Sequence, residues 1–561
     1  KKLYDSIFAL DKAPAISLVD LKASLASILV TIEEQYHGLF ANELRDFIAK
    51  VNVFGYHFAS LDIRQDSRVH HDAFLSLLEQ TNKNGVTDVG FDYVNATEDA
   101  RINFLTSLTG DVDPDSFEDE TVRKALGSIR AMREIQQTNG EAGCKRYIIS
   151  NNQTAQNIFE VFAMIRLSDW EAPNVDIVPL FETIPDLEVA VSVMDKVYAN
   201  PVYREHLTRR GDKQTIMLGF SDGTKDGGYL MANWSIFKAK EELTAISRKY
   251  GINVAFFDGR GGPPARGGGN THQFYASMGN SVEADEIQLT VQGQTISSNF
   301  GTLDTCRYNL EQLLSSGISN RLFTSDSSVL NEEDRKTMTQ LAEVSYEAYK
   351  NFKAHPKFLS YLEHMSTLQY YAKTNIGSRP SKRKSSKSLD FSALRAIPFV
   401  GSWSQLKQNV PGFFGVGTAL ESLDKAGDFD KAKQLYDNNA FFRTLISNSM
   451  MSLQKSFFKL TAYMEKDPEY GAFWKLIYEE YLRSKDYILK LTEMDSLMED
   501  QPEGKASIHI REEIVQPLLT IQQYALLTIQ NSKLSAKERD VMEKMVTRSL
   551  FGNINASRNS A

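Results

Sequence analysis

Two hydrophobic periodicities alternate along the first two thirds of the chain. Apolar residues that recur every three to four positions predict helices, at 13–50, 65–80, 153–168, 185–208, 229–250 and 331–370. Between these stretches lie short apolar runs rich in β-branched and aromatic residues, which are typical of buried strands. The seven runs are Gly55–Ile63, Arg146–Ser150, Val175–Phe181, Thr215–Phe220, Ile252–Phe257, Ile287–Gln292 and Ala393–Val400. From about residue 402 onward the pattern is helical throughout.

Strands that alternate with helices predict an α/β fold with a parallel sheet. Seven strands with helical insertions predict a (β/α)₈ TIM-type barrel whose first strand is missing from this chain. The expected organisation is a helical segment at 1–50, the barrel at 51–400 and a C-terminal helical region at 401–561. The chain starts without Met and already in a helical pattern, so we expect its natural N-terminus to lie upstream.

Composition narrows the function classes. Of the 561 residues 42% are hydrophobic and 24% charged, as in ordinary globular proteins. The net charge of −9 disfavours nucleic-acid binding, which needs a basic face, and no apolar run is long enough to predict a membrane span. The two cysteines, Cys144 and Cys306, lie outside any CxxC or Cys/His cluster, which favours reduced thiols and a cytoplasmic location.

Two carboxylates end neighbouring predicted strands. Glu182 follows the third strand and Asp222 the fourth. In a barrel of this type, polar residues at the carboxyl ends of strands face the active site. Two carboxylates suit Mg²⁺ or Mn²⁺, which keeps waters and takes further oxygen atoms from the substrate. The alternative for each residue is a helix N-cap or an ion-pair partner.

Five arginines also stand near predicted strand ends. Guanidinium groups bind phosphate and carboxylate in bidentate fashion, so a cluster of them predicts a polyanionic ligand. They are Arg64, Arg260, Arg266, Arg379 and Arg395. As isolated surface residues they would carry no such meaning.

Two segments have unusual composition. Gly259–Gly269, the glycine loop, holds six glycines and two arginines. Glycines let backbone N–H groups approach an anion, although a purely structural turn is the alternative. Pro263 and Pro264 argue against a dinucleotide fingerprint. The basic, Ser-rich stretch Gly377–Ser388 fits either a solvated linker or a mobile cationic lid over an anionic substrate.

Six segments, in order along the chain, resemble the motifs of the phosphoenolpyruvate carboxylase family. The two longest are Ile216–Gly228 and the glycine loop with His272. The others are Ser60–Gln65, Pro179–Thr183, Gly377–Arg383 and Leu394–Pro398. The resemblance extends from about residue 50 to the C-terminus.

The resemblance implies a lyase that carboxylates phosphoenolpyruvate with bicarbonate, through carboxyphosphate and an enolate. The product, oxaloacetate, would feed the tricarboxylic acid cycle, and the family is usually tetrameric. By the same resemblance Glu182 and Asp222 are the ligands of Mg²⁺ (or Mn²⁺). The residues that hold substrate are Arg64, Arg260, Arg379 and Arg395, with Lys225 nearby and a lid at 377–391.

The resemblance also implies feedback inhibition by aspartate or malate. The matching positions are Arg266, Lys455, Arg511 and Asn559, and Arg266 would serve both catalysis and inhibition.

The sequence departs from the family pattern in three places. The Thr-Ala-His-Pro-Thr-Glu motif, with its catalytic histidine, is absent, so the chain alone is expected to turn over little. Asp258 stands where relatives commonly carry His, and is expected either to pair with a neighbouring arginine or to tune the loop. Gln294 stands where relatives usually carry Glu.

Two other functions remain open from the sequence. One is a different barrel phosphotransferase that binds phosphoenolpyruvate or pyruvate, which would need a phosphohistidine domain. The other is an inactive anion-binding module.

Overall fold

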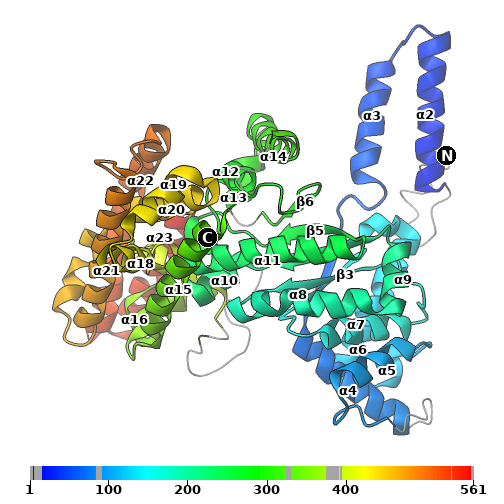
Figure 1. The fold of residues 1–561 in the computed structure, drawn as a ribbon, viewed down its shortest axis with the longest axis horizontal. Helices are drawn as coiled ribbons and strands as arrows, with labels where there is room; N and C mark the ends of the chain where they lie inside the picture. Colours follow the sequence, from blue (N-terminus) through cyan, green and yellow to red (C-terminus); the bar gives the residue numbers. More distant parts are fainter. Residues whose placement is uncertain are drawn as a thin grey trace. The chain divides into compact units, whose positions relative to one another are not determined.

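The computed structural model describes Tyr4 and residues 16–83, 91–291, 294–323, 330–373, 391, 394–531 and 533–557 (Figure 1). Within these ranges the chain is predominantly helical, and its strands form a six-stranded sheet in the order β1-β2-β3-β4-β5-β6. The strands are β1 (Asp62–Asp66), β2 (Arg146–Ser150), β3 (Asp176–Phe181), β4 (Lys213–Leu218), β5 (Asn253–Asp258) and β6 (Ile287–Leu289). The pairs β1–β2, β2–β3 and β5–β6 are parallel, as the alternation with helices predicts.

Six of the seven predicted strands overlap a strand of the structure. The first is shifted: residues of Gly55–Ile63 precede β1, and Phe58 has a φ of 59°, which a strand does not accept. The seventh prediction, Ala393–Val400, is wrong, because Ala396–Gln405 forms helix α17. Pro398 lies in the first turn, where a helix tolerates proline. Both faces of this turn are buried, so its apolar run shows no helical period.

The chain divides into two compact units. Unit 1 comprises Lys1–Phe181, Val189–Met217 and Ile246–Val254, and unit 2 comprises Glu182–Glu188, Leu218–Ala245 and Ala255–Ala561. Helices α8 (Ile184–Ala199) and α11 (Tyr229–Lys249) have residues in both units. The predicted division at residues 50 and 400 remains a prediction.

Unit 1 contains an antiparallel helix pair, α2 and α3, that lie side by side (Figure 1). Its helices are α2 (Leu18–Gln35), α3 (Ala41–Phe54), α4 (Ser67–Lys83), α5 (Glu98–Ser107), α6 (Glu120–Asn139), α7 (Ala155–Arg166) and α9 (Pro201–Arg209), with short 3₁₀ turns η1 (Pro114–Ser116) and η2 (Glu141–Gly143). Every residue of α7 except Asn157 is buried, so this helix lies within the core of unit 1.

Unit 2 contains most of the described helices, among them the longest, α22. They are α10 (Phe220–Gly227), α12 (Thr271–Ala276), α13 (Gln294–Phe300), α14 (Leu303–Phe323), α15 (Glu332–Ala354), α16 (Phe358–Met365), α17 (Ala396–Gln405), α18 (Val416–Lys425), α19 (Phe429–Asn438), α20 (Ala440–Gln454), α21 (Gly471–Thr492), α22 (Pro502–Asn531) and α23 (Ala536–Ser557). The 3₁₀ turns are η3 (Pro264–Arg266), η5 (Leu368–Lys373), η6 (Val410–Gly412) and η7 (Phe458–Lys466).

The main core of unit 2 is an aromatic cluster. Phe352 stacks on Phe414 and Phe473, and Trp403 of α17 lies beside Tyr361. This cluster fixes α17, and with it the segment that holds Arg395. No helix in the described ranges is both long and apolar enough to cross a bilayer.

Candidate functional site

Glu182 and the helix that carries Asp222 meet in unit 2. Glu182 follows β3 and is 4% exposed. It lies against Gly219, the residue that precedes α10: a Cβ built on Gly219 would come 2.9 Å from the Cα of Glu182 and 3.3 Å from its Cγ. Asp222 lies in the first turn of α10. The absence of a side chain at Gly219 therefore lets the two carboxylate-bearing segments adjoin.

Glu182 is not the cap of the helix that follows it. That role belongs to Asp186, whose Oδ2 accepts hydrogen bonds from the backbone N–H groups of Glu182 (3.3 Å) and Thr183 (3.0 Å). The Asp186 N–H in turn donates to Thr183 Oγ1, which completes a reciprocal capping box. The N-cap alternative for Glu182 is thus removed.

The donor set at this place fits Mg²⁺ or Mn²⁺. Among the described residues no group of three or more His, Cys, Asp or Glu side chains converges, so a cage made of protein ligands alone is not offered. Mg²⁺ is commonly held by one or two carboxylates together with waters and substrate oxygens. Glu182 and Asp222 supply that number.

Arg266 is a buried cation close to this pair. It lies in η3, is 1% exposed, and its carbonyl oxygen accepts a hydrogen bond from Ser221 Oγ at 3.0 Å. Burial lowers the pKa of Arg266 to about 10, while the charge of Asp222 acts in the opposite direction. Arg266 and Asp222 are therefore within electrostatic reach of each other.

The glycine loop folds back on itself. The N–H groups of Gly261, Gly268 and Gly269 donate to the carbonyl oxygens of Arg266, Pro263 and Gly262. The prediction that these N–H groups face an anion is wrong, and the structural alternative holds for them. Packing explains the glycine content: a Cβ on Gly267, whose φ is +70°, would lie 2.7 Å from the Cβ of Phe220.

Arg260 links the loop to α12. Its Nη2 donates to the Gly268 carbonyl (2.9 Å), its Nη1 donates to Thr271 Oγ1 (3.2 Å), and its guanidinium lies 4.3 Å from the centre of the Phe274 ring. The side chain is 3% exposed. A stacked, hydrogen-bonded guanidinium of this kind is held in one orientation, which suits recognition of a planar or tetrahedral anion.

Lys225 connects α10 to the start of α17. Its Nζ donates to the carbonyl oxygens of Phe391 (2.7 Å) and Leu394 (2.5 Å) and lies 4.4 Å from the centre of the Phe391 ring. Arg395 is the next residue and the N-cap of α17. Lys225 lies on α10, the helix that carries Asp222, and its hydrogen bonds link this helix to the segment that holds Arg395.

Other predicted site residues are not brought together in the described structure. Arg64 lies in β1, in unit 1, and is half-buried. Arg379 and Asn559 lie outside the described residues, as does most of the predicted lid 377–391. Gln294 begins α13, and its side chain is not described. Convergence of all five arginines remains a prediction.

Asp258 pairs with a lysine rather than with an arginine. Its Oδ2 accepts a hydrogen bond from Lys240 Nζ at 2.6 Å, and both side chains are buried. The one local signal for this pair is the position of Lys240 on the apolar face of its helix, where an unpaired lysine is rare.

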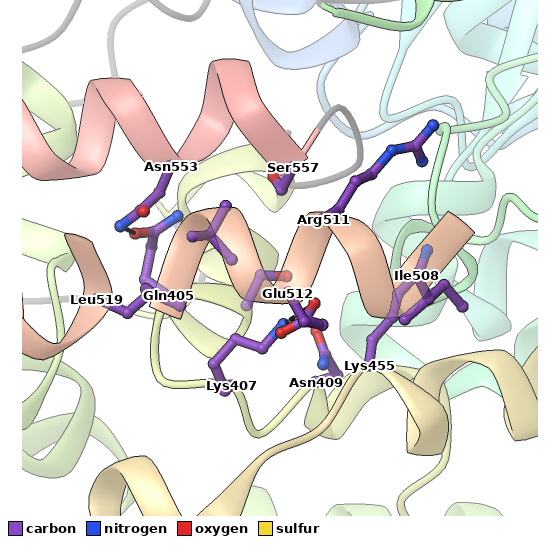
Figure 2. A pocket seen from close by; sticks show the side chains of 12 residues that line it. Gln405, Lys407, Asn409, Lys455, Ile508, Arg511, Glu512, Leu519, Asn553 and Ser557 are labelled. Carbon is purple, nitrogen blue, oxygen red and sulfur yellow. Dashed lines mark hydrogen bonds and ion pairs between the residues drawn. The ribbon is translucent and has the colours of Figure 1, made fainter. Parts of the chain in front are cut away.

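A second candidate site is a pocket beside α22 (Figure 2). Its wall includes Lys407, Asn409, Lys455, Arg511, Glu512 and Asn553. The pocket therefore brings together Lys455 and Arg511, two of the four predicted inhibitor positions. The pKa of Lys455 is lowered to about 8, chiefly by burial and also by the charges of Lys407 and Arg511, while Glu512 acts in the opposite direction.

Sequence reasoning missed the ion pair inside this pocket. Lys407 Nζ donates to Glu512 Oε1 at 2.5 Å, and Figure 2 shows the two side chains directed toward each other. Glu512 adjoins Arg511 in the sequence, but Lys407 is 105 residues away, so no local pattern predicts the contact.

The pocket and the glycine loop share a wall. Asn409 lines the pocket and is the N-cap of η6. A Cβ on Gly412, at the end of η6, would come 2.2 Å from Ser452 Oγ and 3.3 Å from the backbone nitrogen of Ala265, the neighbour of Arg266. One 3₁₀ turn therefore separates the α22 pocket from η3.

These features define a class: an α/β protein with a parallel sheet, and with carboxylates and buried cations where strands give way to helices. The sequence profile of the phosphoenolpyruvate carboxylase family matches residues 13–557, and the chain belongs to that family. Members of the family are carboxy-lyases that act on phosphoenolpyruvate and bicarbonate and generally depend on a divalent metal.

Proposed function

We propose that this chain forms the catalytic and regulatory part of an enzyme that irreversibly carboxylates phosphoenolpyruvate to oxaloacetate and phosphate. The observation that carries the proposal is the adjoining position of Glu182 and the first turn of α10, where Asp222 lies beside buried Arg266. Membership of the family supports the choice of substrates.

Glu182 and Asp222 would hold Mg²⁺ or Mn²⁺, which supplies positive charge against the phosphate and the developing enolate. Arg260 and Arg395, with Arg64 and Arg379, would bind the phosphate and carboxylate groups of the substrate. A bicarbonate oxygen forms a bond to phosphorus as the enol C–O–P bridge breaks, which yields carboxyphosphate and the enolate of pyruvate. Carboxyphosphate then separates into CO₂ and phosphate, and the enolate carbon bonds to CO₂.

Water must be kept from the enolate, since its protonation gives pyruvate. Arg260 and Arg266 are almost fully buried, which supports a dry site at the glycine loop. The basic segment 377–391 is proposed as the lid that completes this exclusion, and Lys225 anchors its C-terminal end at Phe391.

The wider setting belongs to the same proposal. We place the sheet in a (β/α)₈ barrel, supported by its parallel strands in sequence order with helices between them. The enzyme is proposed to act as a cytoplasmic homotetramer that feeds the tricarboxylic acid cycle.

The α22 pocket is proposed as the inhibitor site for aspartate or malate. Two cations on its wall, Lys455 and Arg511, support a dicarboxylate ligand. Asn559 and Arg266 would complete the site. The turn at Gly412, which lies against Ala265, would allow a ligand in the pocket to affect the neighbouring Arg266.

A carboxylation assay coupled to malate dehydrogenase tests the catalytic proposal on the protein expressed from its complete coding sequence. Glu182→Gln and Asp222→Asn are expected to abolish metal-dependent turnover, whereas Glu188→Gln, an exposed acid on α8, serves as the matched control. Unchanged rates in the two site variants would favour an inactive anion-binding module. Transfer of phosphate to a protein histidine would favour the phosphotransferase.

A further inference from the structure

A buried three-residue network ends β5 and has no part in the chemistry described so far. Asp258 is the last residue of β5, and its side chain is 0% exposed. Its Oδ2 accepts two short hydrogen bonds, from Lys240 Nζ on α11 and from the Tyr275 hydroxyl on α12, each at 2.6 Å. Three residues of unit 2, from β5, α11 and α12, therefore meet at one carboxylate oxygen.

The surroundings of the network are apolar and aromatic. Lys240 Nζ lies 5.8 Å from the ring centre of Phe220, 5.1 Å from that of Phe256 and 5.6 Å from that of Tyr275. Burial lowers the pKa of Lys240, and the charge of Asp258 raises it. A charge in such a place is costly unless a partner of opposite sign is in contact, so each of the two ions depends on the other.

Arg260, the proposed substrate arginine, is two residues from Asp258. Burial lowers the pKa of Arg260, and Asp258 is among the groups that raise it. The Asp258 carboxylate and the Arg260 guanidinium therefore interact electrostatically. Asp258 Oδ1 and Arg260 Nε are both buried, and neither has a hydrogen-bond partner in the described part of the chain. Each is available to a new partner once the local charge balance changes.

Lys240 supplies the positive charge that balances the charge of Asp258. With its ammonium group in contact, the Asp258 carboxylate is neutralised where it stands. Without it, the nearest buried cation in the same sequence segment is Arg260, whose role is to meet an anionic ligand.

We propose that Lys240 is a positioning residue for carboxylation: it neutralises Asp258 and thereby leaves the positive charge of Arg260 to the phosphorylated substrate. The inference rests on the proposed function, in which Arg260 binds that substrate. It accounts for an acidic residue at a position where an unbalanced negative charge would oppose substrate binding.

The test is a charge-compensation series on the complete protein, with KM for phosphoenolpyruvate and kcat as readouts. Lys240→Gln is expected to raise KM by about tenfold or more, with kcat changed by less than about threefold. The double variant Lys240→Gln with Asp258→Asn removes both charges and is expected to return KM to within about threefold of the wild type. Asp258→Asn alone removes the carboxylate that would compete, so its KM is expected to rise by less than about threefold.

A role in folding alone predicts a different pattern. Each single variant would then lower thermal stability without a selective rise in KM, and the double variant would show no recovery of KM. Lys238→Gln is the matched control, since Lys238 lies on the same helix with its Nζ over the Trp234 ring and not at Asp258. It is expected to keep the wild-type KM.

Two results would overturn the inference: a wild-type KM in folded Lys240→Gln, or no recovery in the double variant. If Lys240→Gln does not fold, Lys240→Arg keeps the charge in another shape, and a tenfold rise in its KM would show that charge is not the determinant. Failure of the proposed function looks different, since the wild-type protein itself would then not carboxylate phosphoenolpyruvate.

Discussion

Lys225 donates a hydrogen bond to the carbonyl oxygen of Leu394 at 2.5 Å, across 169 residues of sequence. The bond joins α10, which carries Asp222, to the residue before Arg395. The bond therefore links the helix of Asp222 to the segment of Arg395, an acidic and a basic residue of the proposed site. The contribution of the Lys225 side chain to this link can be measured.

Lys225→Met is expected to lower kcat/KM by about tenfold or more, because Arg395 loses its link to α10. The buried carbonyl group of Leu394 and the part-buried one of Phe391 lose a donor, which costs about 1–3 kcal/mol of unfolding free energy. Coupled assays and urea unfolding measure the two effects. Lys350→Met, which removes an exposed lysine paired with Glu347, is the control and should change neither.

Gly219→Ala is expected to displace Glu182, since the new Cβ would sit 2.9 Å from the Glu182 Cα. We expect a loss of about 1–3 kcal/mol in stability and a weaker apparent affinity for Mg²⁺, measured by activity against metal concentration. The control is Gly127→Ala, in α6, whose Cβ would meet nothing within 4 Å. That helical substitution should stabilise by about 0.5–1 kcal/mol. Equal metal affinity in Gly219→Ala and wild type would contradict the proposed ligand role of Glu182.

Glu512→Gln is expected to strengthen inhibition by aspartate or malate about threefold to tenfold, because it removes a carboxylate from the pocket that is proposed to accept a dicarboxylate. Arg511→Gln should act in the opposite direction. Inhibition constants from steady-state kinetics should therefore be lower for Glu512→Gln and higher for Arg511→Gln than for the wild type. Glu513→Gln, the exposed neighbour on α22, controls for a change of helix charge and should leave inhibition as it was. A weaker inhibition in Glu512→Gln would show that the pocket does not bind a dicarboxylate in this way.

Raising the pH through about 8 is expected to weaken inhibition, because the pKa of Lys455 in the folded protein is lowered to about 8 and its ammonium group is then lost. The sign for stability follows from the same difference. Between about pH 8 and the ordinary lysine pKa of 10.5, the unfolded chain binds more protons at this residue than the folded chain, so its contribution to stability rises with pH. Lys455→Met should reduce the pH dependence of both inhibition and urea unfolding over that window. An identical profile in the variant would contradict the assignment.

The sequence predicted the elements whose signal is local. β2 runs from Arg146 to Ser150 as predicted, and the third to sixth strands overlap their predicted runs, because each is a short apolar run between polar ends. Ala393–Val400 shows the same composition but is a helix, since burial on all sides removes the periodic signal that separates the two.

The site was predictable as a set of residue types and not as a set of contacts. Resemblance pointed to Glu182, Asp222 and the arginines, whereas the partner of Asp258 lies 18 residues away on another element. The hydrogen bonds of the loop N–H groups likewise do not follow from the glycine content, because the N–H groups of Gly261 and Gly268 donate to the carbonyl oxygens of Arg266 and Pro263. Such pairings depend on tertiary packing, which one sequence does not encode locally.

The turn at Gly412 lies between the glycine loop and the proposed inhibitor pocket, and any energetic coupling between these two sites must be reciprocal. Whatever a dicarboxylate in the α22 pocket does to the affinity of the glycine loop for substrate, substrate at the loop must do to the affinity of the pocket, by the same factor. Gly412 packs closely between the two sites, since a Cβ there would lie 2.2 Å from Ser452 Oγ and 3.3 Å from the Ala265 nitrogen. If the proposed inhibitor weakens substrate binding, saturation with phosphoenolpyruvate would therefore promote release of that inhibitor at constant inhibitor concentration.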